Sequence, residues 1–224
     1  MKTHFFRLLV ITIAIILVSC NKEKEKVYTD YKYADKPETI TCGDLDTELL
    51  KEALYSFEND ISIHYNAERN TIVRAYSRLI NESLNGRLKF ENVISKHTLE
   101  IFEELKKDKT LWNLDNTKSN LNYNSEVINC IGENIVDARL KSIFNSLKST
   151  NSLSPKLFGE PAKDRAVLTL SDKYLATYIA LEFYYAKLFN VDLTNINFED
   201  RAPNIDFNRK PTQQKIFGNK EATE

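Results

Sequence analysis

The sequence predicts an all-α protein: a single helical-bundle domain of about five helices with an Asn-rich crossover between the third helix and the fourth. Apolar residues recur at intervals of three and four over long stretches, which places them on one face of a helix. The chain shows no repeat period and no alternating pattern typical of a β meander. Its 224 residues suffice for one large or two small domains with a sizeable core.

Three helices are expected in the first half of the chain. The first begins at Asp44, a residue type that caps helix N-termini, and its apolar face comprises Leu45, Leu49, Ala53, Phe57 and Ile61. The second spans 70–84 and ends at Asn85-Gly86, because glycine adopts the left-handed conformation at no steric cost. The third spans 90–107, and the lysines of its last turn suit the negative end of the helix dipole.

The second half begins with an irregular segment, 108–124, which is rich in asparagine, a residue that favours turns over helix interiors. A fourth helix is expected from Ser125 to about residue 147, followed by a loop over 149–161 that is punctuated by proline and glycine. Residues 165–170 fit either a short extended run or the lead-in to a helix. The last helix, 173–189, is apolar on almost every side, which is typical of a central buried helix.

The first twenty residues have the pattern of an export signal. Lys2 and Arg7 precede an apolar run, 8–18, that is about half as long as the ~20 residues a spanning helix needs. Leu17-Val-Ser-Cys20 closes the run and resembles the lipobox of bacterial lipoproteins. The resemblance implies cleavage before Cys20, acylation of its thiol and, in many bacteria, of the new amino group. The alternative is an uncleaved anchor in which Cys20 is an ordinary thiol.

The same resemblance implies a place in the cell envelope, with the protein anchored to the outer membrane by its lipid. Asn21 follows the cysteine, whereas Asp is the residue associated with inner-membrane retention. The charge run 21–26 loosely resembles the surface-export signal of some Gram-negative lineages, although its Lys and Glu alternate. The periplasmic face and the cell surface therefore both remain open.

The composition divides the chain into four segments: a signal peptide, 1–19; a lipid-anchored tether, 20–41; a helical domain, 42–200; and a disordered tail, 201–224. The net charge of −1 moves to about −3 when Lys2 and Arg7 leave with the signal. Such a balance gives no sign of the clustered basic face that nucleic acid requires, so nucleic acid is not an expected partner. It gives no sign of a polybasic patch either, so the membrane contact is expected to come from the lipid.

Two cysteines, Cys42 and Cys130, remain once Cys20 carries lipid. An even pair in an exported chain favours a disulfide, and the alternative is two buried free thiols. Cys42 lies just before the first helix and Cys130 in the first turns of the fourth, and these two helices would begin at opposite ends of a strictly alternating bundle. A disulfide requires the two Cα atoms to lie within about 7 Å, so strict alternation and the bridge are incompatible. The segment 108–124 is therefore predicted to return the chain to its starting end, so that the fourth helix runs parallel to the first and third.

Catalytic motifs are missing from the sequence: the five glycines are too dispersed for a phosphate loop, and no nucleophile elbow or His-Glu-x-x-His motif occurs. His64 with Glu68, and His97 with Glu100 and Glu104, are candidate ligands of a divalent metal, although an ordinary helix-boundary role is the simpler interpretation. Trp112, Tyr123 and the asparagines between them have the aromatic and amide groups that contact a carbohydrate or a peptide. The alternative is a structural role, in which Trp112 covers the end of the third helix and the asparagines form a solvated loop. The tyrosines of the last helix could line a ligand cleft, although such a row of aromatic side chains more often packs in the core. They are Tyr174, Tyr178, Tyr184 and Tyr185.

The sequence therefore favours a non-enzymatic role without a cofactor. The expected function is that of a lipid-anchored envelope protein that binds a protein partner or an envelope ligand, for example as an immunity or inhibitor protein against an exported toxin. The alternative is an envelope hydrolase that uses a carboxylate pair. A concave site with one raised pKa would favour the hydrolase, and an exposed apolar patch would favour binding.

Overall fold

The computed structural model describes residues 28–43, 45, 47–67 and 71–198. Cys20, the tail from 201, Asp44 and Glu68 lie outside the described residues, so the predictions made for them stay predictions. The chain divides between Tyr31 and Lys32 into two units, and every helix given below belongs to the second. In the first unit the rings of Tyr28 and Tyr31 meet edge to face.

The predicted all-α class is confirmed, because the described residues contain helices and, outside them, one isolated bridge between Trp112 and Leu121. The elements are α2 (Glu48–His64), α3 (Ile72–Leu84), η2 (Phe90–Asn92), α4 (Lys96–Leu105), α5 (Glu126–Asn134), α6 (Ala138–Ser149), α7 (Pro155–Asp164), η3 (Ala166–Leu170), α8 (Lys173–Ala180), the π-helical turn η4 (Leu181–Tyr185) and α9 (Ala186–Leu188).

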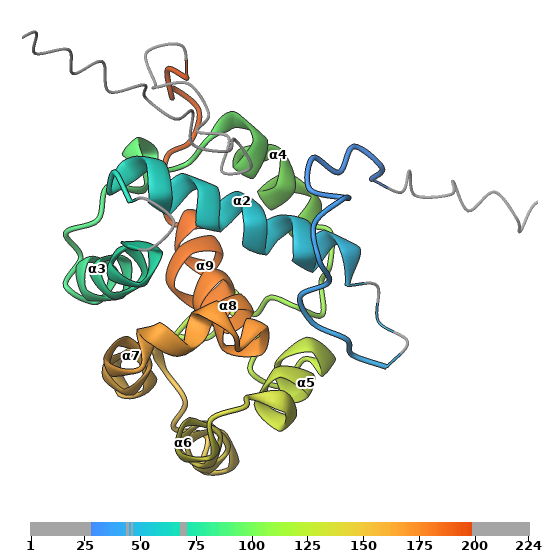
Figure 1. The fold of residues 1–224 in the computed structure, drawn as a ribbon, viewed down its shortest axis with the longest axis vertical. Coiled ribbons are helices and arrows are strands. Elements are labelled where there is room, and N and C mark those ends of the chain that lie inside the picture. The colour runs from blue at the N-terminus through green and yellow to red at the C-terminus, as the bar shows by residue number, and fades with distance from the viewer. Residues whose placement is uncertain (1–27, 44, 46, 68–70, 199–224) are drawn as a thin grey trace, which may run out of the picture. The chain divides into compact units, whose positions relative to one another are not determined.

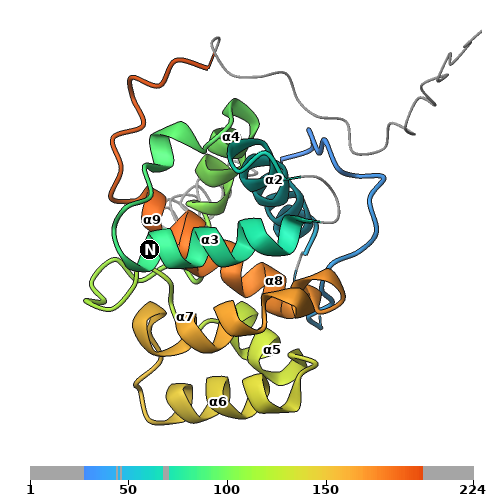
Figure 2. The ribbon, with the colours of Figure 1, turned by 60° about the vertical axis from the view of Figure 1, so that its left-hand side comes forward.

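The continuous helix formed by α8, η4 and α9 is the centre of the core (Figure 1). Every residue from Leu175 to Ala186 is buried. Tyr178 lies between Phe144 of α6 and Phe158 of α7, at ring-centroid distances of 5.0 and 5.3 Å. On the other side Tyr184 packs against Phe57 of α2 at 5.4 Å. The expectation of a central buried helix over 173–189 is therefore correct, and Figure 2 shows α6 and α7 together on one side of it.

The end of α3 follows the sequence prediction, whereas the third predicted helix is interrupted. Gly86 has φ 64°, the left-handed conformation expected just after α3. The continuous helix expected over 90–107 is instead the short η2, a break at 93–95 and then α4. Ser95 makes the break because its hydroxyl accepts a hydrogen bond from Thr98 N and caps α4.

The fourth predicted helix and the loop after it also differ from the structure. The helix divides into α5 and α6, because Asp137 caps a new helix by accepting from Leu140 N. Most of the expected loop 149–161 belongs to α7, which Ser154 caps; Pro155 occupies its first turn, which suits proline, and Pro161 lies inside the helix. The prolines and the glycine that predict a loop over 149–161 thus lie inside a helix.

The predicted disulfide is present: Cys42 and Cys130 are bonded, with their Cα atoms 5.7 Å apart. The Asn-rich segment folds back as a hairpin, with Asn113 N donating to Asn120 O at 2.8 Å and Asn122 N donating to Leu111 O at 2.9 Å. It does not make the extended return that was expected, because its asparagine side chains accept from backbone N–H groups two residues on and build tight turns.

The part of the predicted tether from 32 to 41 packs against α2. Thr39 and Ile40 are buried, and Tyr55 of α2 donates from its hydroxyl to Pro37 O at 3.0 Å. Lys51, which is only 3 % exposed, pairs with Glu38 at 2.9 Å. The structure thus extends the folded domain about ten residues towards the N-terminus of the expected boundary at 42.

Candidate functional site

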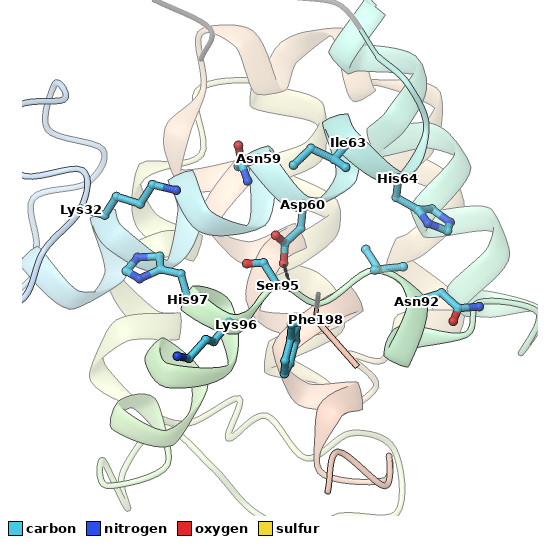
Figure 3. A pocket seen from close by; sticks show the side chains of 11 residues that line it. Lys32, Asn59, Asp60, Ile63, His64, Asn92, Ser95, Lys96, His97 and Phe198 are labelled. Atoms are coloured by element: carbon cyan, nitrogen blue, oxygen red, sulfur yellow. Dashed lines mark hydrogen bonds between the residues drawn. The ribbon is translucent and has the colours of Figure 1, made fainter. Parts of the chain in front are cut away.

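A pocket of about 420 Å³ lies between α2 and the segment that leads into α4 (Figure 3). Asp60 and Ser95 occupy its middle, with Lys32, Lys96 and His97 towards one side and His64 and Asn92 towards the other. Ligand pockets in proteins have volumes of roughly 300–1,000 Å³. The pocket is therefore large enough for a small molecule or for one side chain of a partner.

The break in the third predicted helix shapes this pocket. Ser95 N donates to Asp60 Oδ2 at 3.0 Å, and His97 Nε2 lies 2.6 Å from Glu52 Oε1, so the contacts move back along α2 as the chain advances. The segment from Asn92 to His97 thus runs opposite to α2 (Figure 3), in contrast to the parallel first and third helices that the sequence suggested. The break leaves Ser95 N, which a continuous helix would pair with a carbonyl of the preceding turn, as a donor to Asp60.

Asp60 is the buried acid of the pocket, with only 1 % of its surface exposed. Its Oδ2 accepts from the Tyr184 hydroxyl at 2.7 Å and from Ser95 N at 3.0 Å. Its Oδ1 is buried too, and no donor among the described residues forms a hydrogen bond with it. Burial raises the pKa of the Asp60 carboxyl above its ordinary 3.8, against the opposing effect of hydrogen bonding by Tyr184, Ser95 and Thr98.

Four other polar side chains of the pocket make no hydrogen bond or ion pair through their end groups within the described part of the chain: Lys32, Asn59, Asn92 and Lys96. Lys32 lies 5.2 Å above the ring of Tyr33, which orients its ammonium group without neutralising it. Asn59 is buried, where polar groups are normally paired, whereas Lys32, Asn92 and Lys96 are exposed to solvent. Unpaired donors and acceptors from three separate segments thus meet at one pocket.

The two histidines predicted as metal ligands both line this pocket, but they have different partners. His97 contacts the buried carboxyl of Glu52, which also accepts from Lys32 N and Tyr33 N at 2.8 Å each. His64 packs its ring against Tyr65. No group of three or more His, Cys, Asp or Glu side chains that could hold a metal ion occurs among the described residues.

A second buried acid, Glu182, differs from Asp60 because both of its oxygens are paired. Ser119 donates to its Oε1 at 2.6 Å and Tyr178 to its Oε2 at 3.5 Å. Burial raises the pKa of this carboxyl as well. The bond from Ser119 joins the Asn-rich hairpin to the π-helical turn, and that from Tyr178 lies within the central helix, so Glu182 is a structural link rather than a candidate ligand contact.

Most of the aromatic side chains that the sequence offers as ligand contacts are buried in the core. Trp112 is 8 % exposed, donates from its indole N–H to Leu105 O at 2.7 Å and meets Phe189 edge to face. Tyr123 is also 8 % exposed. Of the tyrosines of the last helix, Tyr178, Tyr184 and Tyr185 are fully buried, whereas Tyr174 donates to Thr41 O at 3.1 Å. These side chains offer little surface to a ligand.

Asp60, the central residue of the pocket, is not among the residues that the sequence motifs indicate. It lies between Phe57 and Ile61 on the face of α2 that was expected to be apolar. An acid within an apolar helical stripe is the signal that identifies it, because burial of an unpaired charge is costly.

Comparison with protein-family models, curated proteins and solved structures finds no match to this chain. Within the described residues, every helix is too short or too polar to span a bilayer.

Proposed function

We propose that this is a lipid-anchored protein of the bacterial cell envelope that acts by binding, and that the pocket between α2 and Asn92–His97 is its binding site. The observation that supports this function is the set of unpaired polar groups around Asp60. In a folded protein such groups are satisfied by solvent or by a ligand, and their convergence on one cavity is typical of a ligand site. The bound species is an envelope ligand or a side chain of a protein partner.

The lipid anchor is supported by the sequence Leu17-Val-Ser-Cys20. Cells that express the full chain and receive labelled fatty acid should transfer label to the protein. The Cys20→Ala variant should take up no label and should keep its signal segment, because the acceptor thiol is missing. Normal labelling of Cys20→Ala would contradict the anchor.

Binding at the pocket is tested by ligand-induced stabilisation of the purified protein. A ligand present at about 100 times its Kd stabilises the native state by about 2.7 kcal/mol, which raises the melting temperature. Envelope extract should raise the melting temperature of the wild type and leave that of Lys96→Gln and Asn92→Ala unchanged. Equal stabilisation of wild type and both variants would place binding elsewhere on the molecule.

A second candidate function is an envelope hydrolase, and the raised pKa of Asp60 in a concave site is the observation that favours it. A carboxylate pair would then be needed, and the nearest buried carboxyl along α2, Glu52, has both oxygens engaged by Lys32, Tyr33 and His97. The binding function is therefore preferred. Hydrolysis of envelope polymer by the wild type, lost in Asp60→Asn, would reverse this preference.

A further inference from the structure

We propose that the pocket accepts an acidic saccharide, a ligand that carries a carboxylate beside several hydroxyl groups. The proposal rests on the proposed function, because it names the chemical class of ligand for the same pocket. It follows from three kinds of groups that line the pocket: cations, unpaired hydrogen-bonding groups and apolar side chains.

The carboxylate of the ligand is assigned to the side of the pocket that holds Lys32 and Lys96 (Figure 3). Neither lysine forms an ion pair within the described residues, so both ammonium groups are available to an anion. Lys96 is also the first residue of α4, and the N–H groups of a first helical turn have no partner inside the helix. A helix N-terminus and two lysines together favour a carboxylate at this position.

The hydroxyl groups of the ligand are assigned to Asp60, Asn59 and Asn92. Asp60 Oδ1 has no hydrogen-bond partner among the described residues, so it would accept from a ligand hydroxyl when ionised and donate to one when protonated. Each amide offers both donors and an acceptor. A sugar hydroxyl donates one hydrogen bond and accepts others, so neighbouring hydroxyls on a ring can satisfy all three side chains. A ligand with a carboxylate alone would leave Asp60 Oδ1 unpaired.

The apolar lining accounts for the remaining surface of a sugar ring. Val93 lines the pocket from the segment that leads into α4. Ile63 lines it from α2, and Phe198 adds an aromatic side chain (Figure 3). The C–H groups of a pyranose ring pack well against such side chains, which exclude water from the polar contacts.

The test uses three probes of similar size with the purified protein: D-glucuronate, D-glucose and cyclohexanecarboxylate. Titration calorimetry at fixed moderate salt should detect binding of D-glucuronate. D-glucose lacks the carboxylate and cyclohexanecarboxylate lacks the hydroxyls, so each should bind at least about tenfold more weakly, the loss expected for one charge-assisted hydrogen bond. An oligoglucuronate that binds at least as tightly as the monomer would indicate a polysaccharide source, and one that fails to bind would indicate a free sugar acid.

Variants assign the contacts. Lys96→Gln should weaken D-glucuronate binding about tenfold and leave D-glucose binding unchanged. Lys156→Gln, which changes an exposed lysine of α7 without an ion pair among the described residues, should alter neither. Asn92→Ala should weaken both sugars. Melting curves of each variant confirm that it is folded, and both pocket variants change side chains at the surface of the domain.

Three results would overturn the ligand class: equal binding of D-glucose and D-glucuronate, equal binding of cyclohexanecarboxylate, or no binding of D-glucuronate. The proposed function has a separate outcome. If D-glucuronate fails to bind while envelope extract still stabilises the wild type and not Lys96→Gln, the pocket is a binding site for another class of ligand.

Discussion

Replacement of the disulfide cysteines, Cys42→Ala with Cys130→Ala, should remove a large part of the stability of the domain. The bridge joins residues 88 positions apart, and its Cα–Cα distance of 5.7 Å is within the normal range, so the folded state accommodates it without distortion. In the chain-entropy account, closure of a loop of that length restricts the unfolded chain by about 4–5 kcal/mol. Domains of this size have total stabilities of about 5–15 kcal/mol.

Urea unfolding followed by circular dichroism measures the effect. The double variant should have a lower midpoint and a larger m-value, because an unfolded chain without the cross-link exposes more surface. The wild type in reducing agent should behave like the double variant, and Cys42→Ala alone should lose as much as the pair. A loss below about 1 kcal/mol with an unchanged m-value would refute the claim that the bridge acts by restricting the unfolded chain.

Two further substitutions test buried positions. Asp60→Asn should change the pH dependence of stability. Because the pKa of Asp60 is raised in the folded state, its favourable contribution to stability is complete below the ordinary value of 3.8 and is lost as the pH rises through the folded-state pKa. The stability of the wild type relative to the variant should therefore fall as the pH rises, and a constant difference in urea midpoints would contradict the raised pKa. Gly132→Ala should cost about 1–3 kcal/mol, because a Cβ there would lie 2.8 Å from both Phe144 and Asn145, and thermal unfolding at an unchanged midpoint would contradict this packing.

The central helix was predictable because its signal does not depend on neighbours. The residues of 173–189 are apolar on almost every side, and the structure buries all of those from Leu175 to Ala186. The disulfide was predictable from the number of cysteines and the export signal together. The end of α3 at Asn85-Gly86 was predictable because glycine adopts the positive φ that this position requires.

The helix breaks were missed because apolar periodicity continues across them. Val93 and Ile94 fit the stripe of a continuous helix and are buried, yet Ser95 caps a new helix between them and His97. The hydroxyl of Ser95 and the carboxylate of Asp137 offer the backbone a competing hydrogen bond, whose outcome depends on tertiary contacts such as that between Asp60 and Ser95 N. α7 differs from the predicted loop because Pro155, a residue typical of loops, also suits the first turn of a helix.

The pocket could not be assembled from the sequence, because its parts are joined by the path of the chain. Lys32 was assigned to a tether, Asp60 to an apolar helix face and Lys96 to the middle of a helix. His64 and His97 were considered together for their metal chemistry, and they do line the same cavity. The metal-site hypothesis therefore pointed to the region of the pocket, although no group of three or more His, Cys, Asp or Glu side chains that could hold a metal ion occurs among the described residues.

The most direct measurement of the central claim is an NMR titration of the side-chain amides with an envelope saccharide fraction. The Nδ2 resonances of Asn59 and Asn92, which have no hydrogen-bond partner among the described residues, should shift on binding. Those of Asn120 and Asn122 should stay fixed, because they donate to Ala186 O and Thr110 O at 2.8 Å each. Shifts at Asn120 and Asn122 with none at Asn59 and Asn92 would contradict the account, since binding would then occur at the Asn-rich hairpin and away from Asp60.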